Sequence, residues 1–251
     1  MHDSYDSFSV PIVVVVLEGA SDKKYLKQPL EAYFREKYNK TCRLVAVTDL
    51  TGNPEISEEE FFPRLRKSIE IGLSSKENMI NEDVAVMITE VVHIFDIDEA
   101  YIENNHITVN KDKKEYFYTR EGIQYFKKSD VEKRNERKQK RIEFLLGQPE
   151  IMLFDKTFPY NKYFYSVNID DFHYDDALNL DKDTKNKKAA EYERKYLVKK
   201  SHQGKLKLFL KIFEKTNPED FPKTLSETWK YISRDNNSLK KCSNVFLIVS
   251  K

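Results

Sequence analysis

Carboxylates directly follow two strongly apolar segments of the sequence. Glu18 follows the run 13–17, and Asp96 and Asp98 follow the run 91–95. Runs rich in β-branched and aromatic residues are typical of buried parallel strands, and open α/β sheets bind ligands at the carboxyl ends of such strands. Converging carboxylates repel one another unless a cation neutralises them, and Mg²⁺ binds such oxygen ligands together with substrate phosphate. The spacing therefore predicts a site for metal-assisted phosphoryl transfer.

The local spacing also indicates which side chains would face the metal. Alternate side chains of an extended segment share one face, so Asp96 and Asp98 can both point at one ion while Ile97 packs into the core. Gly19 permits a tight turn and close approach of a ligand directly after Glu18. We therefore expect Glu18, Asp96 and Asp98 to be catalytic, metal-binding residues. The alternative is that they are solvent-exposed acids in turns.

Other polar residues near these motifs have supporting roles in this interpretation. Asp22 falls in the first turn of the next helix, where an acid interacts favourably with the helix dipole. Asp170 follows a later apolar segment and, in an extended conformation, would be a further candidate metal ligand. Lys23, close to Glu18, is a candidate phosphate contact. His173 lies near aromatic residues and is expected to be structural.

Five apolar runs predict the strands of a core sheet, at residues 11–17, 43–48, 91–95, 163–169 and 245–249. Helical periodicity between the first three runs predicts a β-α-β-α-β order, which implies parallel pairing with right-handed crossovers. We therefore expect an α/β fold with a mostly parallel sheet flanked by helices. The segment 84–88 fits a strand or a short helix equally well.

Polar and proline residues indicate where the helices begin. Ser21 is expected to cap the first helix, and Pro29 should kink or restart it. Ser57 and Glu60 have the spacing of a capping box before the second helix. Further helices are predicted near the end of the chain, at residues 185–200, 204–215 and 219–233.

The pattern changes after the aspartate pair, which predicts an insertion at residues 101–150. Residues 106–110 and 115–119 read as a β-hairpin, followed by a helix over 120–146 with its basic residues on the exposed side. Residues 127–141 contain 8 Lys or Arg against 3 Asp or Glu. Such a segment is typical of a phosphate-binding surface or of a solvated helix. The candidate nucleic-acid contacts on this helix are Arg134, Arg137 and Arg141.

Length and composition limit the class of protein. The chain has 251 residues, enough for one large domain or for a core with an insertion. Its 2 cysteines make no disulfide framework, so the reducing cytoplasm is the simplest expected location. We expect no membrane partner, because no run approaches the ~20 apolar residues of a spanning helix. The first residues also make a poor signal peptide.

The two acidic motifs resemble the signature motifs of the Toprim domain, which occurs in topoisomerases, bacterial primases and several nucleases. Glu18-Gly19 with Asp22 resembles the first motif, and Asp96-Ile97-Asp98 resembles the second. The resemblance implies that Glu18, Asp96 and Asp98 bind Mg²⁺ or Mn²⁺. It divides the chain into a first part of a Toprim-like core (1–100), an inserted hairpin and basic helix (101–150), and the rest of the core with a C-terminal helical elaboration (151–251).

The chain also loosely resembles the stand-alone Toprim-like partners of ATPases in bacterial anti-phage systems, the RloB-like, AriB-like and AbiL-type proteins. That resemblance implies a metal-dependent nuclease that cleaves DNA or RNA. It also implies that this nuclease is the toxic effector of an anti-phage defence system and stays inactive until a partner ATPase senses infection. Nucleic acid and an ATPase are therefore the expected partners.

Two other functions fit the same residues. The segment from Phe95 to Asp98 also resembles the nucleophile motif of haloacid-dehalogenase-like phosphatases, in which Asp96 would attack phosphorus and Asp98 would act as acid and base. That family's motif usually lies near the first strand, and Glu18 would then have no role. A non-catalytic regulatory module with an acidic binding edge is the third interpretation.

Overall fold

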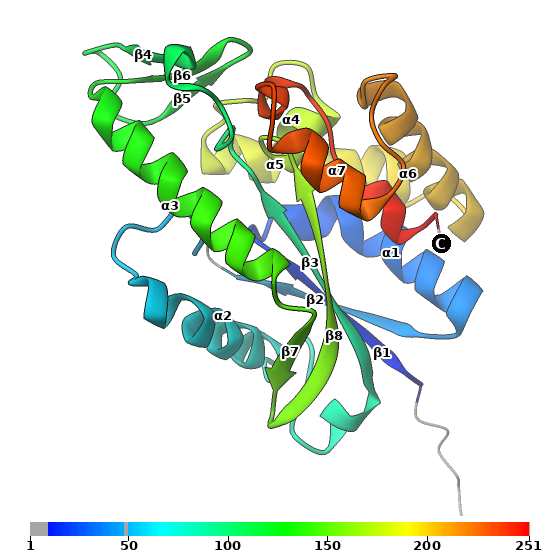
Figure 1. Cartoon of the computed structure of the whole chain (residues 1–251). Helices are drawn as coiled ribbons and strands as arrows, with labels where there is room; N and C mark the ends of the chain where they lie inside the picture. The colour runs from blue at the N-terminus through cyan, green and yellow to red at the C-terminus, as the bar shows by residue number, and fades with distance from the viewer. Residues whose placement is uncertain (1–9, 48–49, 251) are drawn as a thin grey trace, which may run out of the picture.

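The computed structural model describes residues 10–47 and 50–250, and a five-stranded sheet in the order β2-β1-β3-β8-β7 forms its centre (Figure 1). The strands are Ile12–Leu17 (β1), Thr41–Ala46 (β2), Ile88–Asp96 (β3), Glu150–Leu153 (β7) and Lys156–Tyr165 (β8). The first four in this order run parallel, whereas β7 pairs antiparallel with β8. The prediction of an α/β fold with a mostly parallel sheet is confirmed.

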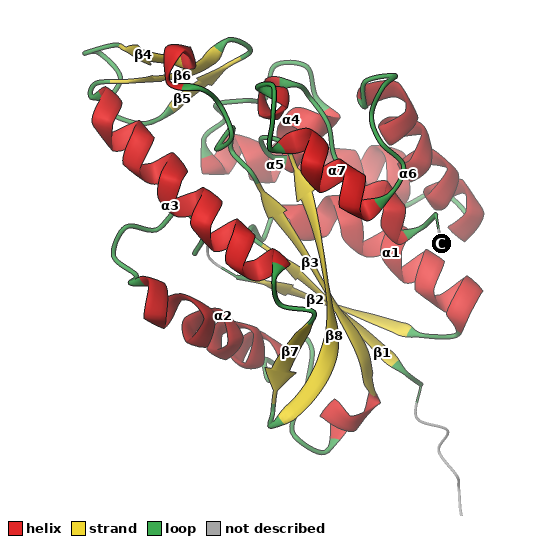
Figure 2. Ribbon diagram, viewed as in Figure 1, coloured by secondary structure: helices red, strands yellow, loops and turns green. Residues whose placement is uncertain are grey.

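Helices cover both faces of this sheet (Figure 2). The helices are Asp22–Tyr38 (α1), Glu58–Leu73 (α2), Lys128–Leu146 (α3), Ile169–His173 (α4), Lys182–Tyr192 (α5), His202–Thr216 (α6) and Leu225–Ile232 (α7). Alternate residues of β1 enter two different apolar clusters, one with α1, α5 and α6 and the other with α2 and α3. Both faces of β1 are buried for this reason, which explains its unbroken apolar sequence.

The start of the chain follows the predicted order, with local differences. β1, β2 and β3 form as expected, although Thr48, the last residue of the predicted second strand, lies outside the described residues. The α2 capping box of Ser57 and Glu60 is confirmed. Ser21 makes no capping hydrogen bond, and α1 continues through Pro29 without restarting. Residues Val84–Met87 form a 3₁₀ turn.

The insertion differs from the predicted hairpin. Ile107–Val109 (β4), Phe117–Thr119 (β5) and Gly122–Tyr125 (β6) form a separate sheet in the order β4-β6-β5. The antiparallel hairpin joins β5 to β6, while β4 pairs with β6 in parallel. The helix predicted over 120–146 therefore begins only at Lys128, because residues 122–125 form the strand that holds this small sheet together.

The end of the chain contains the other departures from prediction. The strand predicted over 163–169 is the longer β8, which ends at Tyr165, and Asn168 caps α4 instead. The run 245–249, predicted as a closing strand, contains a 3₁₀ turn over Val245–Ile248. A short apolar run does not distinguish a strand from a helical turn, and in this region the only bridge to the sheet among described residues joins Tyr165 and Ser243. None of the described helices is long and apolar enough to cross a membrane.

Candidate active site

A cleft of about 620 Å³ lies at the carboxyl ends of β1 and β3, where the sequence predicts the site. Acidic side chains from several elements line it together: Glu18, Asp22, Asp96, Asp98 and Asp170. Its basic lining residues are Lys182 and Lys185. The four predicted metal ligands, Glu18, Asp96, Asp98 and Asp170, thus line one cleft, and Asp22 joins them there.

Asp96, the last residue of β3, is the electrostatic centre of the cleft. Burial raises the pKa of its carboxyl group well above the ordinary value, and the charges of Asp22, Asp98 and Glu18 raise it further. Lys185 acts in the opposite direction. A carboxyl group in these surroundings gains a proton or a cation more readily than one in water.

Glu18 connects the ends of the two central strands. Its Oε2 accepts a hydrogen bond from the backbone N–H of Asp96 at 3.0 Å, and its Oε1 accepts one from the hydroxyl of Thr51 at 3.2 Å. The carboxylate is therefore held against the start of the aspartate motif. Its position depends on the parallel pairing of β1 with β3, which places Leu17 opposite Ile94.

Asp22 interacts with other residues of the cleft, in addition to its predicted interaction with the helix dipole. It does lie in the first turn of α1, but its Oδ2 accepts the Gly19 N–H at 3.0 Å and its Oδ1 accepts the Ser21 hydroxyl at 3.2 Å. Burial and then the charge of Asp170 raise the pKa of Asp22 to about 7. A Cβ at position 19 would lie 2.9 Å from Asp22 Oδ1, so glycine keeps this turn closed.

Asp98 is held by the inserted helix α3. Its Oδ2 makes ion pairs with Lys138 and, at 3.1 Å, with Arg134, which also donates to the Asp98 carbonyl oxygen at 2.7 Å. The backbone of Asp98 has φ of 50°, so the motif leaves the extended conformation expected from its spacing. Asp96 and Asp98 still line the same cleft, whereas Glu99 is fully buried.

The prediction that the basic residues of α3 lie on its exposed side is wrong for several of them, because they point inwards. Arg141 is fully buried and donates to the carbonyl oxygens of Leu50 and Asn53, at 2.7 and 2.8 Å. Arg137 donates to the carbonyl oxygen of Gly52 at 3.0 Å. Arg134, Arg137 and Arg141 thus organise the acidic motif and the loop before α2, and a fully buried Arg141 is not positioned to contact nucleic acid.

Asp170 reaches the cleft from an unexpected conformation. It lies in the first turn of α4 and not in an extended segment. Its Oδ1 accepts the Tyr25 hydroxyl at 2.8 Å, and Lys185 lies 3.9 Å from its Oδ2. Burial raises its pKa, with Tyr25 and Lys185 opposing the shift. The short helix therefore places this carboxylate opposite Asp22.

The other sequence candidates have structural contacts. Lys23 forms an ion pair with Glu77 at 2.8 Å. His173 stacks on Tyr25 with 4.5 Å between ring centroids, and burial lowers its pKa to about 3. A histidine in this environment stays neutral near pH 7, as its predicted structural role requires.

The donor chemistry of the cleft suits a hard divalent cation. All five acids offer carboxylate oxygen, the ligand type that Mg²⁺ and Mn²⁺ bind. A cation would also relieve the repulsion that raises the pKa of Asp96. In the described part of the chain, no three Asp, Glu, His or Cys side chains already surround one point as metal ligands. Asp98 is already paired with Lys138 and Arg134, so Glu18, Asp22, Asp96 and Asp170 are the candidate ligands for a cation.

Comparisons of the sequence and the structure with protein-family models, curated proteins and solved structures found no match.

Proposed function

We propose that this protein is a Toprim-like, metal-dependent nuclease that hydrolyses phosphodiester bonds in DNA or RNA. The observation that carries the proposal is the gathering of five carboxylates, from separate parts of the chain, in one cleft at the carboxyl ends of the parallel strands β1 and β3. Carboxylate oxygens are the ligands that Mg²⁺ prefers, and phosphoryl transfer is a common reaction that uses this cation.

Each side chain has a defined task in this proposal. Glu18, Asp22, Asp96 and Asp170 would hold Mg²⁺ or Mn²⁺, with Asp98 beside them. A bound metal would polarise the phosphoryl group and activate water. Asp22, whose pKa burial and Asp170 raise to about 7 in the metal-free cleft, would release its proton as the cation binds.

Lysines of the cleft supply positive charge for the substrate phosphate. Lys182 and Lys185 line the same cleft as the acids. They replace the arginines of α3 as the candidate phosphate contacts near the metal site. The controlling ATPase partner follows from the resemblance alone and remains a prediction.

Cleavage assays test the proposal directly. Labelled single-stranded and duplex DNA and RNA are incubated with the full chain in Mg²⁺, in Mn²⁺ and in EDTA. We expect metal-dependent cleavage that Asp96→Asn and Glu18→Gln abolish while the circular dichroism spectrum is retained. Glu82→Gln is the matched control, because Glu82 is exposed and precedes β3 at the opposite edge of the sheet.

The same variants separate the other two functions. An acid-stable phosphoenzyme on Asp96, formed from a generic phosphate ester, would identify a phosphatase and contradict the nuclease. A protein that cleaves neither nucleic acids nor esters under any metal condition would be a non-catalytic module.

A further inference from the structure

The acidic cleft continues into a second cavity of about 550 Å³ beneath the inserted sheet. The two cavities share Asp96, Asp98, Asn168, Leu180 and Lys185 as lining residues. The second cavity is also lined by residues 112–118 of the insertion and by residues 178–181. A substrate bound at the acids therefore has a continuous path along the inserted sheet.

Phe117 differs from its aromatic neighbours on this wall. Tyr116 and Tyr118 pack against the apolar cluster of the insertion, which contains Ile107 and Ile123, whereas Phe117 is not part of that cluster. Phe117 is half-buried and lines the second cavity, with the ammonium group of Lys113 3.6 Å from its ring centroid. An aromatic ring that lies outside the apolar core, next to a cation, is suited to contact a flat ligand.

The wall that carries Phe117 is fixed to the core. The N–H of Tyr118 donates to the Asn179 side chain at 2.7 Å, and Asn179 donates back to the Tyr118 carbonyl oxygen at 2.7 Å. Arg120 makes a two-pronged ion pair with the buried Asp171, at 3.0 and 2.6 Å. The backbone on either side of this ring is therefore anchored to the core near the acidic cleft.

One arginine also links this wall to the metal site. Arg134 donates to the Tyr118 hydroxyl at 3.0 Å and makes an ion pair with Asp98 at 3.1 Å. Arg134 therefore ties the end of β5 to the acidic motif. The same guanidinium fixes both halves of the path.

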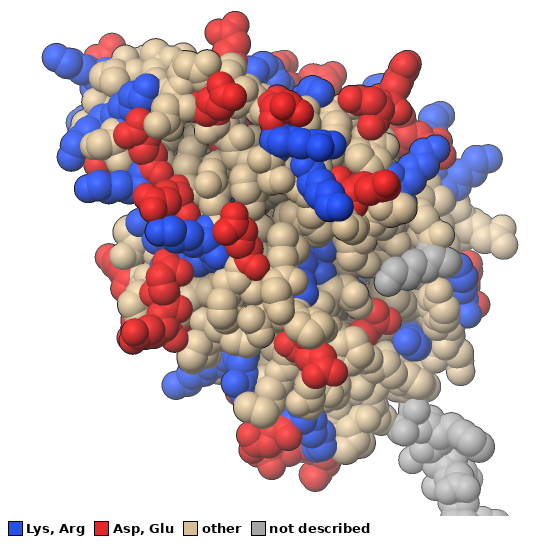
Figure 3. Space-filling view, in the orientation of Figure 1, with Lys and Arg blue, Asp and Glu red and all other residues tan. Residues whose placement is uncertain are grey.

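Basic and acidic side chains are mixed along the path, so a nucleic acid would make single phosphate contacts there and would not lie on a continuous basic surface. Lys113, Lys114 and Lys185 line the second cavity, but so do Asp112, Glu115 and Asp181. On the face of the molecule in Figure 3, basic and acidic side chains are likewise interspersed. Affinity for a nucleic acid would therefore depend on stacking at one point as well as on phosphate contacts.

Resting on the proposed nuclease function, we infer that Phe117 and Lys113 form a subsite for one unpaired nucleotide beside the scissile phosphate. The base stacks on the Phe117 ring, and the Lys113 ammonium moves from the ring to the adjacent phosphate. A base inside a duplex has both faces covered by its neighbours and is not free to stack on a side chain. The substrate is therefore a single-stranded nucleic acid or a single-stranded segment of a folded one.

Binding measurements with the full chain test this subsite. Short fluorescein-labelled single strands of DNA and RNA, and the corresponding duplexes, are titrated in Ca²⁺ and followed by anisotropy, with gels to verify that the strands stay intact. Loss of one stacked base should weaken single-strand binding by roughly tenfold or more in Phe117→Ala. Phe117→Leu should show the same loss, because it keeps apolar volume and lacks the aromatic face. Lys113→Ser should also weaken single-strand binding, and it should leave the fold unchanged.

Phe126→Ala is the matched control, because Phe126 is 44% exposed on the same insertion and does not line the cavity. It should bind like the wild-type protein. Wild-type affinity in both Phe117 variants, equal affinity for duplexes, or no binding of single strands would each overturn the subsite. Cleavage in Mg²⁺ is measured in parallel. Normal cleavage by Phe117→Ala with normal binding rejects the subsite alone, whereas Phe117-dependent binding without any cleavage rejects the nuclease alone.

Discussion

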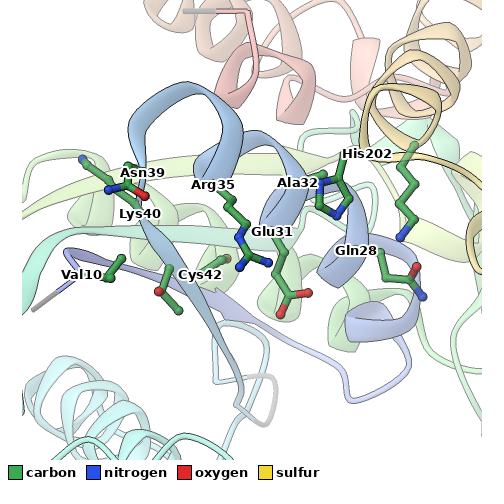
Figure 4. Close-up of a pocket in the computed structure, with 11 residues that line it drawn as sticks. Val10, Gln28, Glu31, Ala32, Arg35, Asn39, Lys40, Cys42 and His202 are labelled. Carbon is green, nitrogen blue, oxygen red and sulfur yellow. The ribbon is translucent and has the colours of Figure 1, made fainter.

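The two edges of the central sheet carry charged cavities that differ in whether neighbouring cations neutralise their carboxylates. The acidic cleft lies at the carboxyl ends of β1 and β3, and a cavity of about 390 Å³ lies at the other edge, where Val10 and Thr41 precede or begin the first strands (Figure 4). This amino-edge cavity mixes Glu31 with cations such as Arg35, Lys40 and Lys205.

The difference lies in the neighbours of each carboxylate. Burial raises the pKa of Glu31, but the surrounding cations Lys27, Arg43 and Lys205 oppose the shift. In the acidic cleft, burial raises the pKa of Asp96 and further acids raise it again. The amino-edge cavity thus compensates its charge locally, whereas the acidic cleft depends on a proton or a cation. Local compensation, and not the number of charges, separates a structural cavity from a candidate metal site.

Removing a buried cation on the acidic side should have the largest effect. Arg141→Met removes the side chain that fixes the loop before α2 and leaves several carbonyl oxygens without their donor. We expect the free energy of unfolding to fall by about 3–5 kcal/mol in urea denaturation. Arg35→Met, in the exposed rim of the amino-edge cavity, should change it by less than about 0.5 kcal/mol. Equal losses in both variants would contradict the comparison.

The pH dependence of stability should show the uncompensated acids next. Asp22 has an ordinary pKa of 3.8 and a pKa of about 7 in the folded protein, so the folded state binds its proton more tightly. This contribution to stability is present below about pH 4 and is lost as the pH rises to about 7. Asp22→Asn removes the loss and should gain about 2–4 kcal/mol on the wild-type protein across this window in EDTA. The free energy of unfolding is measured in urea at each pH. If it changes with pH in the same way in both proteins, burial and Asp170 do not raise the pKa of Asp22.

The sequence predicts the strands that carry the acids, because buried parallel strands need continuous apolar runs. It does not reveal how Asp22 is used. The role of Asp22 depends on Asp170, which a short helix brings across the cleft from a distant part of the chain. Gly19, three residues before Asp22, is the local signal for the closed turn that this contact needs.

The inward-pointing basic residues of α3 escape prediction for a related physical reason. Lys and Arg are seldom fully buried unless paired, so a run rich in them predicts a solvated face. Lys138 and Arg141 are buried because Asp98 and the carbonyl oxygens of the loop before α2 satisfy them. These partners lie 40 or more positions away in the sequence, and no local pattern reports them. Similarly, the pairing of β4 with β6 depends on tertiary contacts, and the predicted hairpin runs at 106–110 and 115–119 do not determine it.

Divalent cations should stabilise only the acidic edge. At a concentration about 100 times the dissociation constant, a ligand specific for the folded state adds about 2.7 kcal/mol, so Mg²⁺ or Mn²⁺ should raise the melting temperature by several degrees. Asp96→Ala should lose this response, whereas Glu31→Gln, in the amino-edge cavity, should keep it. Differential scanning calorimetry with Mg²⁺ and with EDTA measures both. An unchanged response in Asp96→Ala would place the cation elsewhere.

The smallest expected effect belongs to the compensated carboxylate itself. The raised pKa of Glu31 means that its charged form is slightly disfavoured in the folded protein, despite the cations around it. Stability from this group is therefore lost as the pH rises above its ordinary pKa of 4.5. Because the side chain is partly solvated and its charge is screened, Glu31→Gln should raise the free energy of unfolding at pH 7 by only about 0.5 kcal/mol. A gain as large as that of Asp22→Asn would mean that the cations of the amino-edge cavity do not compensate Glu31, and the contrast between the two edges would then fail.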